Sequence, residues 1–219
     1  MSWPDLTDWW LSEVATDRAY DEVVSPLLIE VLAPAEGRRY LDIGCGEGRV
    51  MRALTDLGAK AEGVDINHDF AARAGTAVVA DVLAMPFRDS SYDGAYSVLA
   101  LEHVADHRAF FTESARVTRT GGVLAVVINH PVWTAPESTP VSDSDGEVLW
   151  RPGAYFSIGS SQIPAGDGTV TFHHRSMGDL LNAAADTGWA LEQMIERPHH
   201  ELGDQAGIPR LLACRWRRE

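Results

Sequence analysis

The amino-acid sequence predicts an α/β protein built on a mostly parallel sheet of seven strands with helices on both faces. Three observations predict this class. Short apolar runs alternate with segments of helical periodicity. The run 122–129, "GVLAVVIN", is continuously apolar, as a strand buried on both faces is. The first apolar run ends in a glycine turn that opens a helix, as in sheets that bind nucleotides.

The elements follow in an order typical of a doubly wound, Rossmann-like sheet. Segment 5–32 has apolar residues at helical spacing, interrupted near Ser25-Pro26, and predicts one or two leading helices. Segment 210–218 is expected to be an antiparallel C-terminal strand. The other strands are expected at 38–43, 60–66, 76–82, 92–99, 122–129 and 189–198, and the other helices at 50–58, 67–75, 106–122 and 176–188.

We expect one domain over residues 1–219, with an N-terminal helical cap (1–35), a cofactor-binding core (38–129), a lid (130–170) and a C-terminal part (171–219). Segment 130–170 is rich in Pro, Gly, Ser and Asp and holds several aromatic residues. A loop of this length inside a compact domain is usually functional. It is therefore predicted to be a substrate lid, with self-packing of its aromatic side chains as the alternative.

Composition excludes several classes of protein. The net charge is −14 and Lys60 is the single lysine, so a nucleic-acid substrate is not expected. No apolar run is long enough for a membrane span, and the acidic N-terminus lacks a signal-peptide core. Cys45 and Cys214 are far apart in sequence and predict neither a disulfide framework nor a zinc site. We expect a cytoplasmic protein without membrane contact, and the sequence does not predict its oligomeric state.

The glycine turn "YLDIGCGEGRV" (40–50) predicts a ligand site. Dinucleotide sites need G-x-G-x-x-G, whereas here the third glycine, Gly48, comes one residue early. Asp42 precedes Gly44 by two residues. A carboxylate there is unsuited to a pyrophosphate and suited to a cationic amino group.

Two further acids end the next two strands. Asp65 follows the loop by about 20 residues, where a carboxylate accepts ribose hydroxyls. Asp81 ends the third predicted strand, where a carboxylate can accept an adenine amine and Val82 can offer a backbone donor. Together these residues describe a ligand with an amino acid, a ribose and an adenine but no phosphate. That ligand is S-adenosylmethionine.

The chain resembles the class I S-adenosylmethionine-dependent methyltransferases of the small-molecule type, similar to those of ubiquinone biosynthesis. The resemblance lies in "LDIGCGEGRV", "GVDIN", "ADVLAMPFRDSSYDGAYSVLALEHV" and "RVTRTGGVLAV", over about 38–130. It implies that Gly44 and Gly46 meet the methionine and ribose, with Asp42 behind them and Cys45 as a small filler. It also implies Asp65 and Ile66 at the ribose and adenine, Asp81 and Val82 at the adenine, and Leu99 beside the methionine.

Methyl transfer requires an aligned nucleophile, and a base only where that nucleophile carries a proton. His130 is the candidate base because it follows a buried strand at its ligand-binding end; a surface histidine before Pro131 is the alternative. The substrate pocket is predicted to include Tyr20, His103, His173 and Trp133. Of Trp9 and Trp10, at most one is expected to close the pocket, because neighbours on a helix point about 100° apart.

No metal site is predicted, since no cysteine or third carboxylate supports Glu102, His103 and His107. The segment after the fourth strand, "SVLALEHV", lacks the Asn/Asp-Pro-Pro-Tyr of enzymes that methylate nucleic-acid bases or protein amides. The sequence therefore predicts transfer of a methyl group to an O, N or C atom of a small acceptor. The alternative is a binding protein that holds S-adenosylmethionine or S-adenosylhomocysteine without chemistry.

Overall fold

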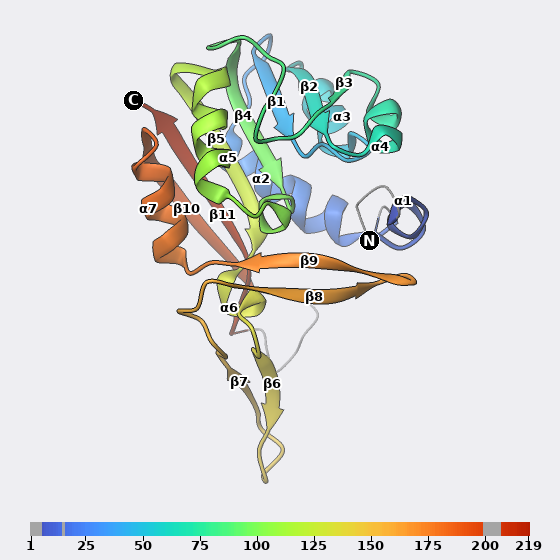
Figure 1. The fold of residues 1–219 in the computed structure, drawn as a ribbon, viewed down its shortest axis with the longest axis vertical. Coiled ribbons are helices and arrows are strands. Elements are labelled where there is room, and N and C mark those ends of the chain that lie inside the picture. Colours follow the sequence, from blue (N-terminus) through green and yellow to red (C-terminus); the bar gives the residue numbers. More distant parts are fainter. Residues whose placement is uncertain (1–5, 15, 199–206) are drawn as a thin grey trace.

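The computed structural model describes residues 6–14, 16–198 and 207–219. Its centre is a seven-stranded sheet in the order β3-β2-β1-β4-β5-β11-β10, drawn in Figure 1. The pairs β1–β2, β1–β4, β2–β3 and β4–β5 are parallel, and β11 is antiparallel to both β5 and β10. The predicted fold class is thus confirmed. The strands are β1 (Arg39–Ile43), β2 (Lys60–Asp65), β3 (Ala77–Val79), β4 (Tyr92–Val98), β5 (Thr118–Asn129), β10 (Trp189–Pro198) and β11 (Pro209–Arg218).

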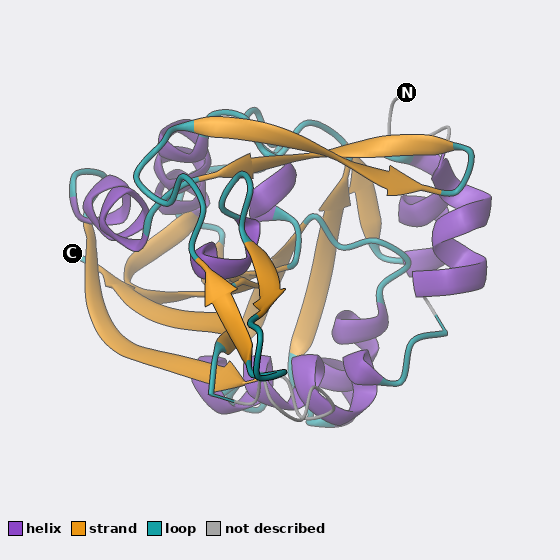
Figure 2. Ribbon diagram, turned by 90° about the horizontal axis from the view of Figure 1, so that it is seen from below, coloured by secondary structure: helices purple, strands orange, loops and turns teal. Residues whose placement is uncertain are grey.

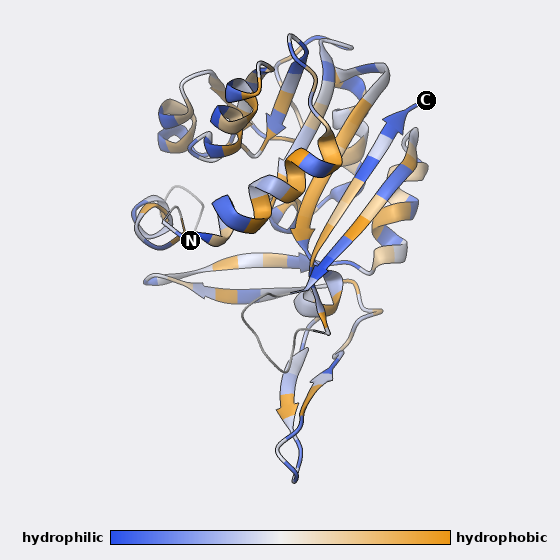
Figure 3. Cartoon of the chain, turned by 180° about the vertical axis from the view of Figure 1, so that it is seen from behind, coloured by the Kyte–Doolittle hydropathy of each residue, from blue (hydrophilic) through white to orange (hydrophobic). Residues whose placement is uncertain are grey.

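Helices cover both faces of the sheet (Figures 1 and 3). On one face, Leu28 and Leu32 of α2 pack with Leu54 of α3 and with apolar side chains of β5 and β11. On the other face, Phe111 of α5 and Leu180 of α7 join a second core cluster. The helices outside the segment 130–174 are α1 (Thr7–Trp9), η2 (Trp10–Val14), η3 (Tyr20–Val24), α2 (Ser25–Leu32), α3 (Arg49–Asp56), α4 (His68–Ala74), η4 (Leu101–His103), α5 (His107–Val117) and α7 (Met177–Ala185).

Two expected boundaries were wrong. Ser25 and Pro26 do not interrupt the leading helix: Val24 and Ser25 keep right-handed helical dihedral angles, and the N–H of Ser25 donates to the Tyr20 carbonyl, so the π-helical turn η3 passes directly into α2. Residues 118–122, expected at the end of a helix, instead begin β5. Thr118 pairs with Tyr92 of β4, which extends the strand backward from its apolar run.

The segment expected to be a lid loop consists mainly of two hairpins and a short helix. These elements are α6 (Pro131–Thr134), β6 (Thr139–Ser142), β7 (Val148–Arg151), β8 (Gly159–Ala165) and β9 (Gly168–His174). The β6–β7 hairpin projects away from the sheet and has a hydrophilic tip (Figure 3).

The β8–β9 hairpin runs toward the N-terminal helices, and it is the long two-stranded ribbon along one edge of Figure 2. Ala165 and Val170 at its tip form a small apolar cluster with Leu6. Trp9 and Phe172 pack against this cluster. The hairpin therefore connects the end of the sheet to the N-terminal cap.

Candidate active site

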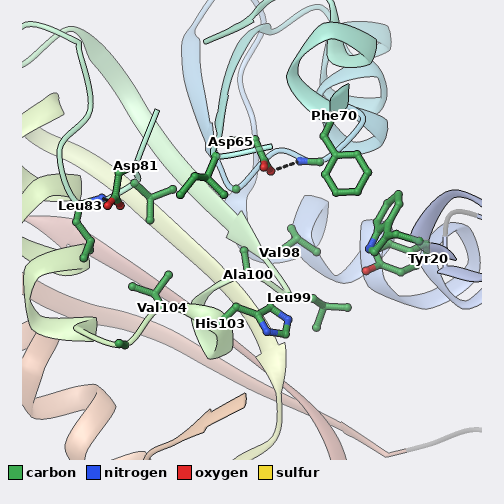
Figure 4. Close-up of a pocket in the computed structure, with 16 residues that line it drawn as sticks. Tyr20, Asp65, Phe70, Asp81, Leu83, Val98, Leu99, Ala100, His103 and Val104 are labelled. Carbon is green, nitrogen blue, oxygen red and sulfur yellow. Dashed lines mark hydrogen bonds between the residues drawn. The ribbon is translucent and has the colours of Figure 1, made fainter. Parts of the chain in front are cut away.

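A cavity of about 310 Å³ lies beyond the carboxyl ends of β1, β2 and β4, where parallel sheets of this topology bind ligands. Figure 4 shows its lining side chains. A smaller cavity of about 50 Å³ adjoins it around the glycine turn and shares Trp10, Tyr20, Gly44, Gly46 and Val98 with it. The larger cavity is lined by Trp10, Tyr20, Gly44, Gly46, Asp65, Ile66, Phe70, Asp81, Val82, Leu83, Val98, Leu99, Ala100, His103, Val104 and Ala105.

Asp65 joins the glycine turn to the start of α4. Its Oδ2 accepts the N–H of Gly46 at 2.9 Å and its Oδ1 accepts the N–H of Asn67 at 2.8 Å. Burial raises the pKa of Asp65, and the backbone N–H groups partly oppose this shift. A carboxylate has about four acceptor sites. Asp65 thus retains capacity for ligand hydroxyl groups at the middle of the cavity.

The glycine turn has a backbone that only small residues can follow. Gly44 has φ +80°, and a Cβ on it would lie 2.6 Å from the Cβ of Ala100. Gly46 has φ +52°, and a Cβ on it would lie in van der Waals contact with the Trp10 ring, at 3.8 Å. The absence of both side chains leaves room for a ligand against the backbone.

Asp42 is a buried acid that lines the smaller cavity. Burial raises its pKa well above the usual range, and the charges of Asp65 and Glu47 add to the effect. Cys45 lies beside it, and burial likewise raises the pKa of its thiol. Cys45 is thus a packed thiol rather than a reactive thiolate. A cationic group beside Asp42 would offset the free-energy cost of burying its ionised carboxylate.

One end of the larger cavity is lined by apolar side chains and one carboxylate. Asp81 lies there with Leu83 and Val104 (Figure 4). Asp81 accepts the N–H of Leu83 at 2.9 Å. Ile66 is 55% exposed although it is apolar, which suits a side chain that packs against a ligand. This end fits a planar heterocycle with a donor group.

Aromatic side chains from the N-terminal cap and α4 form the opposite end. The Trp10 ring centroid lies 5.1 Å from that of Phe70 and 6.4 Å from that of Tyr20. Burial raises the pKa of Tyr20, so its hydroxyl stays protonated. Trp9 instead packs against Gly166 of the β8–β9 hairpin. The expectation that at most one of the two tryptophans closes the pocket is confirmed.

The turn after β4 lines one side of the larger cavity. Leu99 adopts φ +51°, a left-handed conformation that costs about 1–3 kcal/mol for a non-glycine residue and clusters at functional sites. Its N–H is held by the Val127 carbonyl at 2.8 Å. Ala100 and His103 follow from the same turn, η4. This part of the chain therefore turns sharply beside the cavity.

His130 is not placed to act on a ligand in this cavity, which corrects the expectation of a base. Its side chain is 3% exposed, and it lies outside the cavity lining. Nδ1 accepts the N–H of Val132 as the cap of α6, and Nε2 lies 2.8 Å from Glu196 Oε1 on β10. Burial lowers the pKa of His130, and Glu196 opposes this shift. The residue joins α6 to the edge of the sheet.

Two predicted substrate-pocket residues also lie elsewhere. Trp133 stacks on Trp150 with ring centroids 4.2 Å apart, and Arg210 lies over its ring at 5.0 Å. His173 is half-buried on β9 and lies outside the cavity lining, and burial lowers its pKa. Its neighbour His174 is buried and contacts Thr134 and Tyr155. Trp133, Trp150 and Tyr155 thus contact residues of 130–174, as in the self-packing alternative to a lid, whereas Phe156 is 89% exposed.

The structure brings most other predicted site residues together. The larger cavity contains Gly44, Gly46, Asp65, Ile66, Asp81, Val82, Leu99, Tyr20 and His103, and the smaller one contains Asp42 and Cys45. Their individual roles stay predictions. Residues that the sequence did not indicate are Phe70, Leu83, Val98 and Ala105, together with Glu47, Arg49 and Val50 of the smaller cavity. Two signals could have indicated some of these residues: the helical spacing of Phe70, and the position of Ala105 directly after "LEHV".

Within the described ranges, the histidines, cysteines and acids form no cluster of three suited to a metal ion. In the same part of the chain, no helix has the length and apolar character needed to cross a bilayer.

Comparisons with known proteins agree with this geometry. The family model described as a methyltransferase domain matches residues 41–126. An O-methyltransferase of Penicillium expansum is 31% identical over 166 residues, which are 68% of this chain and 57% of that protein. An uncharacterized methyltransferase of Mycobacterium tuberculosis is 37% identical over 111 residues, 47% of this chain and 43% of that protein. The chain thus spans about half the length of these two relatives.

A solved structure resembles nearly the whole chain. The S-adenosylmethionine-dependent methyltransferase of Mesorhizobium loti is 26% identical, with a TM-score of 0.79 over 94% of this chain and 100% of that one. The fold and the cavity define a Rossmann-like protein with a cavity at the carboxyl end of its sheet. The family match and this structure make the chain similar to the class I S-adenosylmethionine-dependent methyltransferases.

Proposed function

We propose that the protein transfers the methyl group of S-adenosylmethionine to a hydroxyl oxygen of a small, uncharged and largely apolar molecule. The observation that carries the proposal is a pair of adjoining cavities, the larger lined by Asp65 and Asp81 and the smaller by Asp42, with the aromatic rings of Trp10 and Tyr20 lining both. Asp81 suits the adenine, Asp65 the ribose and Asp42 the amino group. These are the functional groups of S-adenosylmethionine, and no phosphate is needed to explain the site.

The chain's own groups bind and shield this cofactor. When bound, S-adenosylmethionine supplies an electrophilic methyl group on a cationic sulfur. Trp10, which faces Gly46 across the cavity, and Tyr20 exclude water from that place and present aromatic faces to a positive charge. The carboxylates of Asp42 and Asp65 add a negative field.

The same field selects against anionic acceptors. No Lys or Arg is among the described residues that line the larger cavity, whereas Asp65 and Asp81 are. Arg49 lies at the smaller cavity, where it packs over Tyr20 at 5.0 Å and faces Glu47 at 3.5 Å. A carboxylate or diphosphate in the larger cavity would have no cation to pair with. Oxygen is proposed over nitrogen and carbon because the Penicillium relative is an O-methyltransferase.

Calorimetric titration with S-adenosylmethionine, S-adenosylhomocysteine and NAD tests the cofactor. Micromolar binding of the two adenosyl ligands alone is expected, and tight binding of NAD would contradict the proposal. Transfer of a tritiated methyl group to 1-naphthol, aniline and thiophenol then tests the chemistry. Cofactor binding without transfer to any of these acceptors would favour the alternative, a binding protein without catalytic activity.

A further inference from the structure

The carboxyl of Asp42 in the smaller cavity has little around it to stabilise a negative charge. Asp42 is buried, and it lines that cavity. Each oxygen of Asp65, by contrast, accepts a backbone N–H. Within the described part of the chain, the hydroxyl of Tyr96 is the one hydrogen-bond donor next to the Asp42 carboxyl. The charge of Asp42 therefore depends on Tyr96.

The sheet places these two side chains together. β1 and β4 are parallel neighbours, and Asp42 lies directly opposite Tyr96 in their register. Residues paired in this way point to the same face of a sheet, here the face that α2 covers. Tyr96 is fully buried, and its hydroxyl makes no hydrogen bond of standard geometry with any residue that the structure describes. Buried hydroxyl groups are rarely left without a partner, and the adjacent acceptor is Asp42.

Burial decides which of the two groups holds a proton. It raises the pKa of Tyr96, and the charge of Asp42 adds to this shift, so the phenol keeps its proton and can donate a hydrogen bond. Burial also raises the pKa of Asp42; the hydroxyl of Tyr96 opposes this shift, whereas the charges of Asp65 and Glu47 increase it. The other titratable side chains that line the smaller cavity are Tyr20, Cys45 and Arg49. Arg49, the cation among them, pairs with Glu47 at 3.5 Å.

We propose that Tyr96 is a positioning residue for cofactor binding: its hydroxyl donates to the ionised carboxylate of Asp42 and keeps Asp42 in the form that binds the amino group of S-adenosylmethionine. The inference rests on the proposed function, in which Asp42 is the partner of that amino group. Where the Asp42 carboxyl is protonated, arrival of the cationic amino group displaces the proton to solvent. Tyr96 thereby acts on the amino acid half of the cofactor. It leaves the adenosine half, which suits Asp65 and Asp81, unaffected.

Two ligands separate the halves of the cofactor. S-adenosylhomocysteine carries the amino acid, whereas 5′-methylthioadenosine keeps the adenosine and the thioether but lacks the amino acid. Tyr96→Phe removes one oxygen and keeps the ring. By calorimetry at neutral pH, it should weaken binding of S-adenosylhomocysteine about ten- to hundred-fold, because it removes a hydrogen bond to a charged group. Affinity for 5′-methylthioadenosine should stay within about threefold. Equal losses for both ligands, or no loss for either, would overturn the proposal.

A pH profile distinguishes this role from a purely structural one. The affinity of the wild type for S-adenosylhomocysteine should fall between about pH 7 and about pH 5, because binding must then remove a proton from Asp42. In Tyr96→Phe the fall should begin at a higher pH. The ratio of the two ligands' dissociation constants at each pH cancels the titration of Asp65, whose ribose both ligands share. A structural defect would shift the ratio by the same factor at every pH, and such parallel profiles contradict the proposal.

Two further variants serve as controls. Tyr92→Phe alters the same strand, where the hydroxyl donates to Glu62 at 2.8 Å outside both cavities, and should leave the ratio unchanged. In an Asp42→Asn background, Tyr96→Phe should not change the ratio further, because an amide cannot ionise. If the wild type binds neither ligand, the proposed cofactor fails, and the role of Tyr96 fails with it. A wild type that prefers S-adenosylhomocysteine, with an equal preference in Tyr96→Phe, contradicts the role of Tyr96 alone.

Discussion

Gly44→Ala is expected to destabilise the protein through a contact that a second substitution can relieve. The added Cβ would lie 2.6 Å from the Ala100 Cβ, roughly 1 Å inside an ordinary carbon–carbon contact. Overpacking of this kind costs about 1–3 kcal/mol. The φ of +80° adds the cost of a left-handed alanine, about 1–2 kcal/mol. The free energy of unfolding should therefore fall by roughly 2–5 kcal/mol.

Ala100→Gly separates the two contributions. Alone, it should cost about 0.5–1 kcal/mol through the added freedom of the unfolded chain. Combined with Gly44→Ala, it removes the clash and leaves the left-handed alanine, so the double variant should recover about 1–3 kcal/mol. Urea denaturation of the four proteins, followed by circular dichroism, measures the coupling. Strictly additive effects, or a Gly44→Ala variant as stable as the wild type, would refute the close approach of the glycine turn to η4.

Three other substitutions test the cavity. Asp65→Ala should weaken binding of S-adenosylhomocysteine about ten- to hundred-fold by calorimetry, through loss of a charged hydrogen-bond acceptor, while Asp69→Ala on the exposed face of α4 should not. Trp10→Ala should weaken the same affinity, whereas Trp9→Ala should mainly lower the melting temperature; the reverse pattern would contradict the placement of the two rings. Asp42→Asn should stabilise the ligand-free protein, by an amount that grows as the pH rises from about 4, because the raised pKa of Asp42 makes its ionisation unfavourable in the folded state. The same variant should bind S-adenosylmethionine, a cation, more weakly.

The sequence predicted the sheet well because its strands have strong local signals. β2 ends at Asp65, β1 ends one residue after Asp42, and the apolar run 122–129 lies within β5. Each signal depends on burial of neighbouring residues along one strand, which a sequence displays directly. The two hairpins were missed because β8 has little apolar alternation. Ser160, Gln162 and Pro164 are exposed. β8 therefore lacks the row of buried apolar side chains that would mark it as a strand in the sequence.

The sequence predicted the region of the site better than the orientation of its histidines. His130 does follow β5 at the ligand-binding end of the sheet, as expected. Its side chain turns away because it caps α6 and meets Glu196, which is 66 residues later in the chain. The His103 ring contacts the carbonyl of Thr171 on β9, and Arg175, directly after β9, donates to the Leu101 carbonyl of the same turn. Partners so distant in sequence leave no local pattern to read.

The contact between the β8–β9 hairpin and the N-terminal cap has a consequence for synthesis of the chain. Leu6 and Trp9 are made early, but their apolar partners Ala165, Val170 and Phe172 are made more than 150 residues later. Until then, the first helices have only their contacts with α4, such as that of Trp10 with Phe70, to hold them near the glycine turn. A nascent chain can thus form its sheet early and still hold the nucleoside loosely. A nascent chain that binds the cofactor tightly would therefore have been translated at least as far as residue 172.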